Sequence, residues 1–587
     1  MLHGLYRSDS RVSVISFGSI NTKKAFKEFC QSLYRFGVKK EELRQKKREV
    51  LKIFEAQNSI EMDGRTIEGQ NQFSVADDRE ENILHTTANG GHEDTIQPLD
   101  TRGDSIKATD KDIESLLHSA VRDGDTDMVK QLLENGTSIE AMDEDNNTPL
   151  HLAALDGHTC VVELLLGRGA LVEALTKDND TPLHLAARGG HTGVVKLLLE
   201  KGALIEALTK TNNHTPLHLA AQSSHTGVVE ILLKKSALIE ALNKYNDTPL
   251  HLAVLNGHTG VVELLLGKGA LIEALNMTGD LTLLHLAVWK GYTGVVELLL
   301  GKGTLIEALD EDNNTPLHLA AGSGHTGIVE LLIGKGALIE ALNKDNNTPL
   351  HLAAWSGHTG VVEILLGKGA LIEALNKDNN TPLHLAAWDG HTGPVELLLG
   401  KGALIEALTK INNDTPLHLA AQSGHTGIVE ILLEKGALIE ALNEDNDTPL
   451  HLAAQSGHID VVELLLGKGA LIEALTKISN DTPLHLAAWD GHAGVVELLL
   501  GKGALIEALN KDNYTPLHLA SLSGHTGVVE LLLNTGASVG ARNRLGQIPL
   551  SFAIWGGNTD ILQLLQNRAS ELVQENSPRY KLRQGQK

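Results

Sequence analysis

The chain contains almost no cysteine. Its only two cysteines, Cys30 and Cys160, lie far apart among 587 residues and belong to no paired pattern. A disulfide framework or a zinc knuckle would need several cysteines at short, regular spacings. This scarcity excludes both and favours an intracellular protein.

Long hydrophobic runs are also absent. The first twenty residues contain an apolar run of only VSVI, and the runs elsewhere are of the VVELLL kind. A signal peptide needs about 7–15 apolar residues and a membrane-spanning helix needs about 20. We therefore expect no signal peptide and no transmembrane segment. The expected location is the cytoplasm, with the nucleus as an alternative.

Aromatic residues make up only 3% of the chain, whereas leucine, alanine and glycine are abundant. A single hydrophobic core stops growing at about 250–300 residues, so a chain of this length must contain several domains or an extended array. Few aromatic rings and regularly placed leucines indicate many thin, similar cores.

Positive charge is scarce, because the formal net charge is −24. Residues 1–81 carry 15 Lys and Arg against 13 Asp and Glu, so the acidic excess belongs to the remainder. Such an acidic remainder would repel nucleic-acid phosphates, and we expect no nucleic-acid partner for it. The only stretch suited to an anionic membrane surface is the basic segment 21–56.

What the sequence does contain is a repeat. A TPLH box begins at Thr148 and recurs every 33 or 34 residues as far as Thr515, once in the form TLLH. Residues 348–380 and 381–413 are identical at 28 of 33 positions. Weaker boxes extend this register to about 15 units between residue 82 and about residue 570. A fixed period of this size indicates a stacked repeat architecture.

The residues of one unit predict two short helices. Thr148 and Pro149 suit the N-cap and first turn of a helix, and Gly157 suits its left-handed end. Thr159 can cap a second helix, rich in Val and Leu, which Gly169 closes. One unit cannot bury this apolar surface alone, whereas stacked units can.

The pattern TPLHLAA-x-x-GH-x-x-VV-x-LLL-x-x-GA resembles the ankyrin repeat. The resemblance implies an all-α repeat fold: a solenoid of helix–turn–helix units with β-hairpin fingers, preceded here by a small helical N-terminal segment. It also implies that the recurring histidines bond neighbouring backbone and pack between units.

The sequence divides into six expected parts. They are a basic helical segment (1–57), a polar linker (58–81), divergent N-terminal repeats (82–147), near-identical repeats (148–547), a C-terminal capping repeat (548–570) and a polar tail (571–587). The first segment either covers the end of the array or docks separately to a partner. Ser224 and Ser236 replace glycines of the neighbouring units, so we expect their unit to be the least stable.

The candidate chemistry recurs too regularly to be a site. Of the 28 histidines, 14 occupy TPLH-like boxes and 12 precede the second helix. The GKG triplets lack the upstream glycine and strand of a phosphate loop, and the glutamates of VVEL and LIEA recur in almost every unit. We expect no metal, no cofactor and no enzymatic activity.

Function should lie where the units differ. The most variable helical position is the eighth of each unit, counted from the Thr of its box, and it holds all five tryptophans of the chain. The resemblance places this position on the concave surface, where partners bind. The rings could also simply stack on adjacent units, and both readings stay open. The candidate partner-binding residues are Trp289, Trp355, Trp388, Trp489, Trp555, Leu155, Arg188, Leu255, Leu522, Tyr245, Tyr514, Asp389 and Asp490.

Exposed tryptophan among carboxylates suits a protein segment with apolar anchors and basic residues. The sequence therefore predicts a non-enzymatic scaffold or adaptor that binds proteins in an acidic concave groove. One alternative is a targeting or regulatory subunit that recruits an enzyme complex, such as a ubiquitin ligase or a signalling complex, through the N-terminal helices. Another is a host-directed effector of a host-associated microbe.

Overall fold

The computed structural model describes residues 110–273 and 281–575. They belong to one compact unit, Asp104–Lys587. The predicted segments 1–57 and 58–81, and the first divergent repeat, lie outside the described residues. Along the described ranges the chain forms 28 α-helices and no strands.

The helices come in pairs, one pair per repeat. The first helices are α3 (Asp110–Arg122), α5 (Pro149–Asp156), α7 (Pro182–Gly189), α9 (Pro216–Gln222), α11 (Pro249–Leu255), α13 (Leu283–Lys290), α15 (Pro316–Ser323), α17 (Pro349–Trp355), α19 (Pro382–Asp389), α21 (Pro416–Ser423), α23 (Pro449–Ser456), α25 (Pro483–Asp490), α27 (Pro516–Ser523) and α29 (Pro549–Gly556). The second helices are α4 (Thr126–Glu134), α6 (Thr159–Gly167), α8 (Thr192–Glu200), α10 (Thr226–Lys234), α12 (Thr259–Gly267), α14 (Thr293–Gly301), α16 (Thr326–Gly334), α18 (Thr359–Gly367), α20 (Thr392–Gly400), α22 (Thr426–Glu434), α24 (Ile459–Gly467), α26 (Ala493–Gly501), α28 (Thr526–Asn534) and α30 (Thr559–Glu575).

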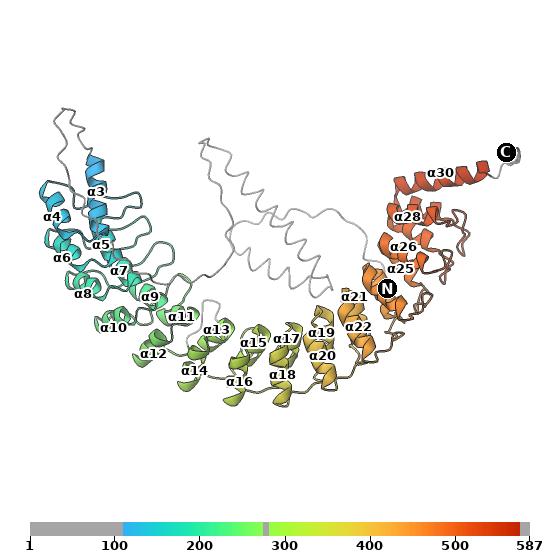
Figure 1. The fold of residues 1–587 in the computed structure, drawn as a ribbon, viewed down its shortest axis with the longest axis horizontal. Coiled ribbons are helices and arrows are strands. Elements are labelled where there is room, and N and C mark those ends of the chain that lie inside the picture. The colour runs from blue at the N-terminus through green and yellow to red at the C-terminus, as the bar shows by residue number, and fades with distance from the viewer. Residues whose placement is uncertain (1–109, 274–280, 576–587) are drawn as a thin grey trace, which may run out of the picture. The chain divides into compact units, whose positions relative to one another are not determined.

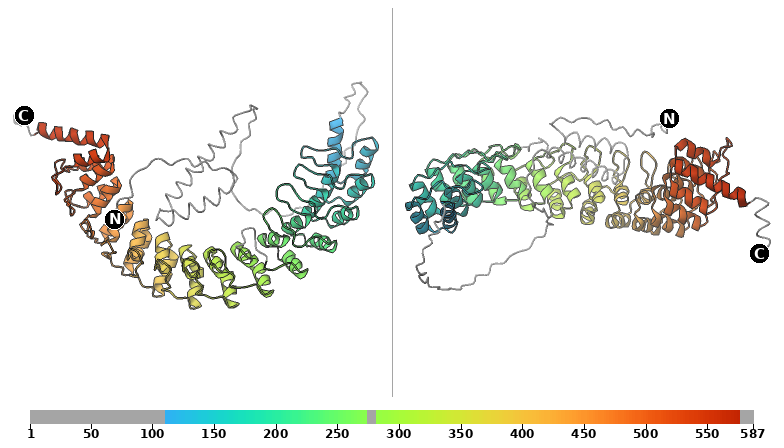
Figure 2. Two further views of the ribbon diagram at one scale, coloured as in Figure 1. Left: turned by 180° about the vertical axis from the view of Figure 1, so that it is seen from behind. Right: turned by 90° about the horizontal axis from the view of Figure 1, so that it is seen from above.

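The pairs stack in a single row, and the main helix contacts join members of the same or adjacent repeats. Between α13 and α20 the first helices form the inner layer of the row and the second helices form the outer layer (Figure 1). Figure 2 shows the same row from behind and from above. The predicted all-α stack of helix pairs is confirmed.

The core is one continuous layer between the helix pairs. In a typical repeat Leu150, Ala153 and Ala154 of the first helix are fully buried, as are Val161 and Val162 of the second. The small alanines let adjacent first helices approach closely, and the branched side chains fill the space to the second helices. Each buried Leu or Val contributes about 1.5–3 kcal/mol before chain entropy is subtracted.

The TPLH box fixes the first helix. Thr148 is the N-cap, Pro149 occupies the first turn, and the helix ends at Gly157 with a left-handed φ of 81°, as predicted. The backbone N–H of Thr148 donates to Nδ1 of His151 over 3.1 Å. Nε2 of the same ring donates to the carbonyl of Asp180 in the next repeat over 3.0 Å. The repeated histidine therefore caps its own helix and joins it to its neighbour.

The prediction that Thr159 caps the second helix is wrong. The N-cap is His158, which makes no side-chain cap bond, and Thr159 is the first helical residue. The imidazole of His158 reaches the previous repeat instead, where Nε2 donates to the carbonyl of Arg122 over 2.8 Å. The ring of His158 occupies the space that a side chain on Gly124 of the previous repeat would need. This explains why most repeats have glycine at the position of Gly124.

The fingers between repeats are tight turns, so the expected β-hairpins do not occur among the described residues. The N–H of Asn343 donates to the carbonyl of Asn347, and Asn346 adopts a left-handed φ of 57°. Adjacent fingers share a single backbone bond at this junction, from Lys344 N–H to the carbonyl of Asp312 over 2.8 Å. One bond per junction holds neighbouring fingers together without building a strand ladder.

The last helix, α30, continues to Glu575, beyond residue 570, where we placed the end of the capping repeat. Ile561 and Leu565 of this helix are buried against the array. Residues 576–587 of the predicted tail lie outside the described part of the chain.

Candidate partner-binding groove

The eighth position of each unit lies at the C-terminal end of the first helix, one step beyond the buried alanines. The five tryptophans there are between 38% and 54% exposed. Leu155 and Arg188 are exposed as well, whereas Leu255 and Leu522 are half-buried. The position thus stands at the edge of the core, as the sequence predicts, and each tryptophan presents part of its ring to solvent.

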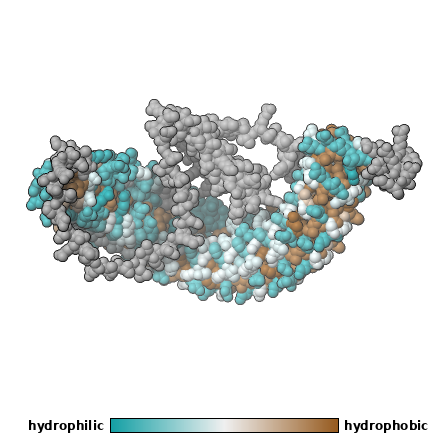
Figure 3. All heavy atoms as spheres, turned by 45° about the horizontal axis from the view of Figure 1, so that its top comes forward, coloured by the Kyte–Doolittle hydropathy of each residue, from teal (hydrophilic) through white to brown (hydrophobic). Residues whose placement is uncertain are grey.

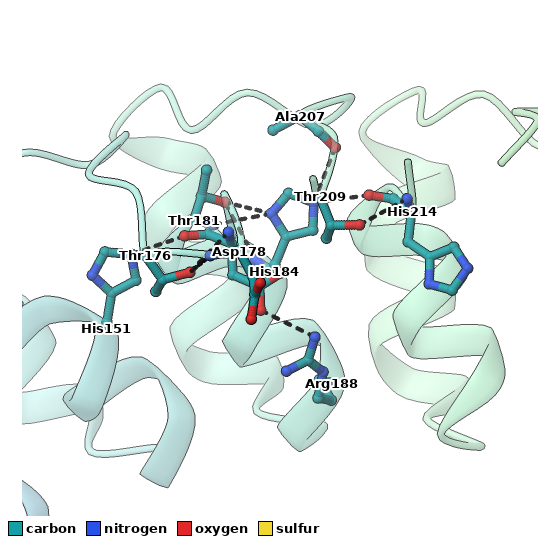
Figure 4. Close-up of polar contacts among 10 residues, drawn as sticks. His151, Thr176, Asp178, Thr181, His184, Arg188, Ala207, Thr209 and His214 are labelled. Atoms are coloured by element: carbon teal, nitrogen blue, oxygen red, sulfur yellow. Dashed lines mark hydrogen bonds and ion pairs between the residues drawn. The ribbon is translucent and has the colours of Figure 1, made fainter. Parts of the chain in front are cut away.

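In the repeat of α7, the finger residue that precedes the TPLH box contacts this position. Nη2 of Arg188, at the end of α7, lies 3.1 Å from Oδ2 of Asp180 (Figure 4). Asp180 is itself buried and is followed directly by the N-cap Thr181. One side of the surface is therefore built by helix ends and the other by fingers. We call this surface, between the eighth positions and the residues before the boxes, the groove.

The tryptophans do not pair with one another. Among the described residues, no aromatic contact joins two of their rings. Trp555 packs at a tilt on Phe552 of its own helix, with ring centroids 5.1 Å apart. The ammonium of Lys290 lies 4.4 Å from the ring centre of Trp289. Mutual stacking of the rings therefore does not explain why tryptophan recurs at this position.

The two candidate tyrosines occupy different environments. Tyr245 is exposed at a finger, where its N–H donates to Oδ1 of Asn243. Tyr514 is half-buried and lies edge-on to Phe552, with centroids 5.1 Å apart. Phe552 also contacts Trp555. The structure thus connects Tyr514 with the last tryptophan through Phe552, whereas no aromatic contact involves Tyr245 among the described residues.

The two candidate aspartates also differ. Asp389 is half-buried, and its Oδ2 lies 3.0 Å from Nε2 of His391 in the same repeat. Asp490 is exposed at the corresponding place in α25. Each aspartate directly follows a tryptophan and is the last residue of its helix, α19 or α25. Each therefore adds negative charge beside an exposed ring.

A row of three finger carboxylates escaped our sequence analysis. Asp414, Asp447 and Asp481 precede three successive boxes and occupy the finger side of the groove. Nδ2 of Asn443 donates to Oδ1 of Asp414 over 2.9 Å, and Nδ2 of Asn510 donates to Oδ1 of Asp481 over 2.8 Å. The corresponding residue beyond Asp447 is Thr476, which lacks an amide donor. The signal in the sequence was this alternation of Asn and Thr after EAL.

The row concentrates negative charge. Burial, together with the carboxylates of Asp445, Asp414 and Asp481, raises the pKa of Asp447 to about 6. A carboxyl group responds in this way when taking a charge is opposed by desolvation and by like charges nearby. A cation placed in this part of the groove would offset the repulsion between these carboxylates.

The recurring histidines are structural where the chain is described. The rings of the TPLH boxes are buried and bridge adjacent repeats, as in the contact from Nε2 of His351 to the carbonyl of Asn380 over 3.0 Å. Within the described ranges, no group of three or more His, Cys, Asp or Glu could hold a metal ion. The same residues include no helix long and apolar enough to cross a membrane.

Comparisons with known proteins agree with this architecture. The family model for ankyrin repeats, which describes three copies at a time, matches nine stretches that overlap from residue 84 to residue 276 and again from residue 284 to residue 576. The chain belongs to the ankyrin-repeat family. Repeats of this family are protein–protein interaction modules, and this defines the class of the protein.

Among solved structures, the chain is similar to the ankyrin repeat domain of human ASB11. The two are 30% identical, over 38% of this chain and 99% of that domain, with a TM-score of 0.36. The comparison with curated proteins finds no match.

Proposed function

We propose that this protein is a scaffold whose groove binds a protein segment carrying apolar anchors and basic side chains. The observation that carries this proposal is the placement of every tryptophan of the chain at one position, each partly exposed at the edge of the groove. Tryptophan supplies large contact area at low entropic cost and is enriched at interface hot spots.

The charge of the groove supports the basic part of the segment. Asp389 and Asp490 lie beside tryptophans, and the carboxylate row of Asp414, Asp447 and Asp481 lies along the fingers. Lysine or arginine placed near these carboxylates would gain electrostatic attraction and raise the association rate. An acidic segment would meet like charge and would be excluded.

The test uses displayed peptide libraries with the full chain as bait. One library alternates apolar and basic residues, and a second alternates apolar and acidic residues. We expect enrichment from the basic library only, and at least tenfold weaker binding of the enriched peptides by the double variant Trp355→Ala and Trp388→Ala. A control variant, Ile459→Thr, changes an exposed apolar residue at the start of α24, outside the groove, to the residue of the preceding repeat, and should bind like the parent chain.

Enrichment of acidic peptides, or unchanged binding by the tryptophan variant, would contradict the proposal. Binding should also strengthen as pH rises through about 6, because the pKa of Asp447 lies there and its ionised form attracts the cation.

A further inference from the structure

A second apolar surface lies outside the groove. The residue that follows the GA, GT or SA after each second helix is leucine in eleven consecutive repeats, from Leu171 to Leu505. These side chains, which we call the first leucine row, are between 61% and 66% exposed. Their backbone is fixed by the preceding repeat, since the N–H of Leu371 donates to Oε1 of Glu340 over 2.9 Å.

A second leucine row runs beside the first. It lies four residues further along each repeat, from Leu175 to Leu509, and its described members are between 48% and 57% exposed. A turn connects the two rows, as shown by the bond from the N–H of Ala374 to the carbonyl of Leu371 over 3.1 Å. Such a turn keeps its ends within about 7 Å, so the rows are neighbours on the surface.

The fold does not require these leucines. The first row ends on both sides in serine, at Ser138 and Ser538, and both serines are exposed within intact repeats. Hydrophobic residues recur along the visible face of the array, between hydrophilic ones (Figure 3). A solvent-facing position that keeps leucine through eleven repeats, although serine suffices elsewhere, is suited to an interface.

The area is large enough for a stable complex. Eleven leucines at this exposure present on the order of 1,000 Å² of apolar surface, compared with about 300–600 Å² for the largest patch of a typical monomer. A stable interface buries about 800 Å² per partner, and obligate homodimers bury more. The first row alone reaches this range.

We propose that the two leucine rows form an interface between two copies of this chain. The rows repeat with the period of the array, about 10 Å per layer, and a partner must offer apolar groups at the same period to fill them along their length. A second copy has this period by construction. The same surface on both copies is the usual arrangement of a homodimer.

Charge disfavours an anionic membrane as the occupant. The finger lysines beside the second row lie near carboxylates of the preceding finger: Nζ of Lys377 is 3.5 Å from Asp345, and Nζ of Lys344 is 3.9 Å from Asp312. The flank of the rows is therefore mixed in charge rather than basic. Interfacial membrane binding draws on a basic flank as well as an apolar face.

Sedimentation velocity of the full chain tests the proposal, over about 1 to about 100 µM. We expect a dimer that dissociates at least tenfold more readily when Leu338, Leu371 and Leu404 are all changed to serine, the residue of the terminal repeats. Circular dichroism checks that the variant keeps its helices. The groove variant Trp355→Ala and Trp388→Ala should dimerise like the parent chain, which separates this proposal from the proposed function.

A parent chain that stays monomeric throughout this range would overturn the proposal. So would a dimer that the three serines leave unchanged, because the interface would then lie elsewhere. A monomeric chain that cosediments with phosphatidylserine vesicles through these leucines would overturn it in favour of a membrane surface.

Discussion

At the scale of the residue, each TPLH histidine depends on being neutral. Nδ1 of His351 accepts the N–H of Thr348 over 3.1 Å, while Nε2 donates to the carbonyl of Asn380. A protonated imidazole carries hydrogen on both nitrogens and cannot accept the first bond. The contact that repeats through the array is therefore sensitive to acid at every repeat.

This sensitivity predicts a pH dependence of stability. Burial lowers the pKa of eleven of these histidines, for example that of His351 and of His384 to about 4. Because the unfolded ring titrates near 6.5, the unfolded chain binds more protons between these values, and stability present above pH 6.5 is lost as pH falls towards 4. Each histidine with a pKa of about 4 contributes on the order of 3 kcal/mol.

Urea titrations at a series of pH values measure this effect. At pH 5.5 complete unfolding should take up about one proton for each of the four histidines whose pKa is about 4, which are His218, His351, His384 and His451. The raised pKa values of Asp447 and Asp247 act in the opposite direction, but they concern two carboxyl groups against eleven imidazoles. A stability that does not change between pH 7 and pH 5 would contradict the prediction.

The repeat that contains Ser224 and Ser236 allows a prediction about the stability gained by restoring glycine. Ser224 and Ser236 have φ values of 65° and 71°, where the neighbouring repeats place glycine. A left-handed conformation costs a residue with a side chain about 1–2 kcal/mol. Glycine avoids this cost, but it loses more conformational entropy on folding than serine does, which offsets part of the gain. Changing either serine to glycine should stabilise the repeat by about 0.5–1 kcal/mol.

Hydrogen exchange of α9 and α10 measures this gain locally. The matched control is Ser223→Gly, because Ser223 has a φ of −99° and gains nothing from glycine. Equal protection in the Ser224 and Ser223 variants would show that the strain is absent.

At the scale of the element, the glycine before each second helix is constrained by the next repeat as well as by its own backbone. Gly324 has a φ of 78°, and a Cβ on it would lie 2.6 Å from Nδ1 of His358. Gly336 of the same repeat has a φ of 96° but has nothing within 4 Å of such a Cβ. Both glycines have a positive φ, but only Gly324 lies against a side chain of the next repeat.

This pair separates backbone strain from packing between repeats. Gly336→Ala should cost about 1–2 kcal/mol, since only the left-handed conformation is penalised. Gly324→Ala should cost about 1–3 kcal/mol more, because the ring of His358 must also move from its place against the previous repeat. Urea denaturation of both variants gives the difference, and equal losses would mean that the ring adapts freely.

The sequence predicts much of this element-level structure. The caps at Thr148 and Gly157 and the helix pairs follow from the local chemistry of the residues in each unit. The role of His158 and the absence of strands in the fingers do not. The contact of His158 and the geometry of the fingers both depend on the distance between adjacent repeats. The residues of a single unit do not determine that distance.

The groove shows the same division. The exposed edge position of the tryptophans could be predicted from its place beside the buried stripe. The carboxylate row of Asp414, Asp447 and Asp481 is signalled only by the alternation of Asn and Thr after EAL, whereas the burial and like charge that raise the pKa of Asp447 arise only when the repeats stack. The partner-binding role of both sets remains the proposal made above.

At the scale of the whole molecule, stability should be local because the main contacts join neighbours. The main helix contacts join the same or adjacent repeats, so stability is a sum of repeat and junction terms. A destabilising substitution at one end should therefore lower the stability of the nearest few repeats and leave the repeats at the other end unchanged.

Phe552 in the last helix pair tests this locality. It is 2% exposed, and its ring lies 5.1–5.2 Å from the rings of Tyr514, His518 and Trp555. Phe552→Ala should cost about 3–5 kcal/mol, and Trp555→Ala, which removes a half-exposed ring from the same helix, should cost less. In native-state hydrogen exchange, α27 to α30 should lose protection in the Phe552 variant while α5 to α12 keep theirs. A uniform loss of protection along the array would contradict the prediction, because it would mean that all repeats unfold together as one cooperative unit.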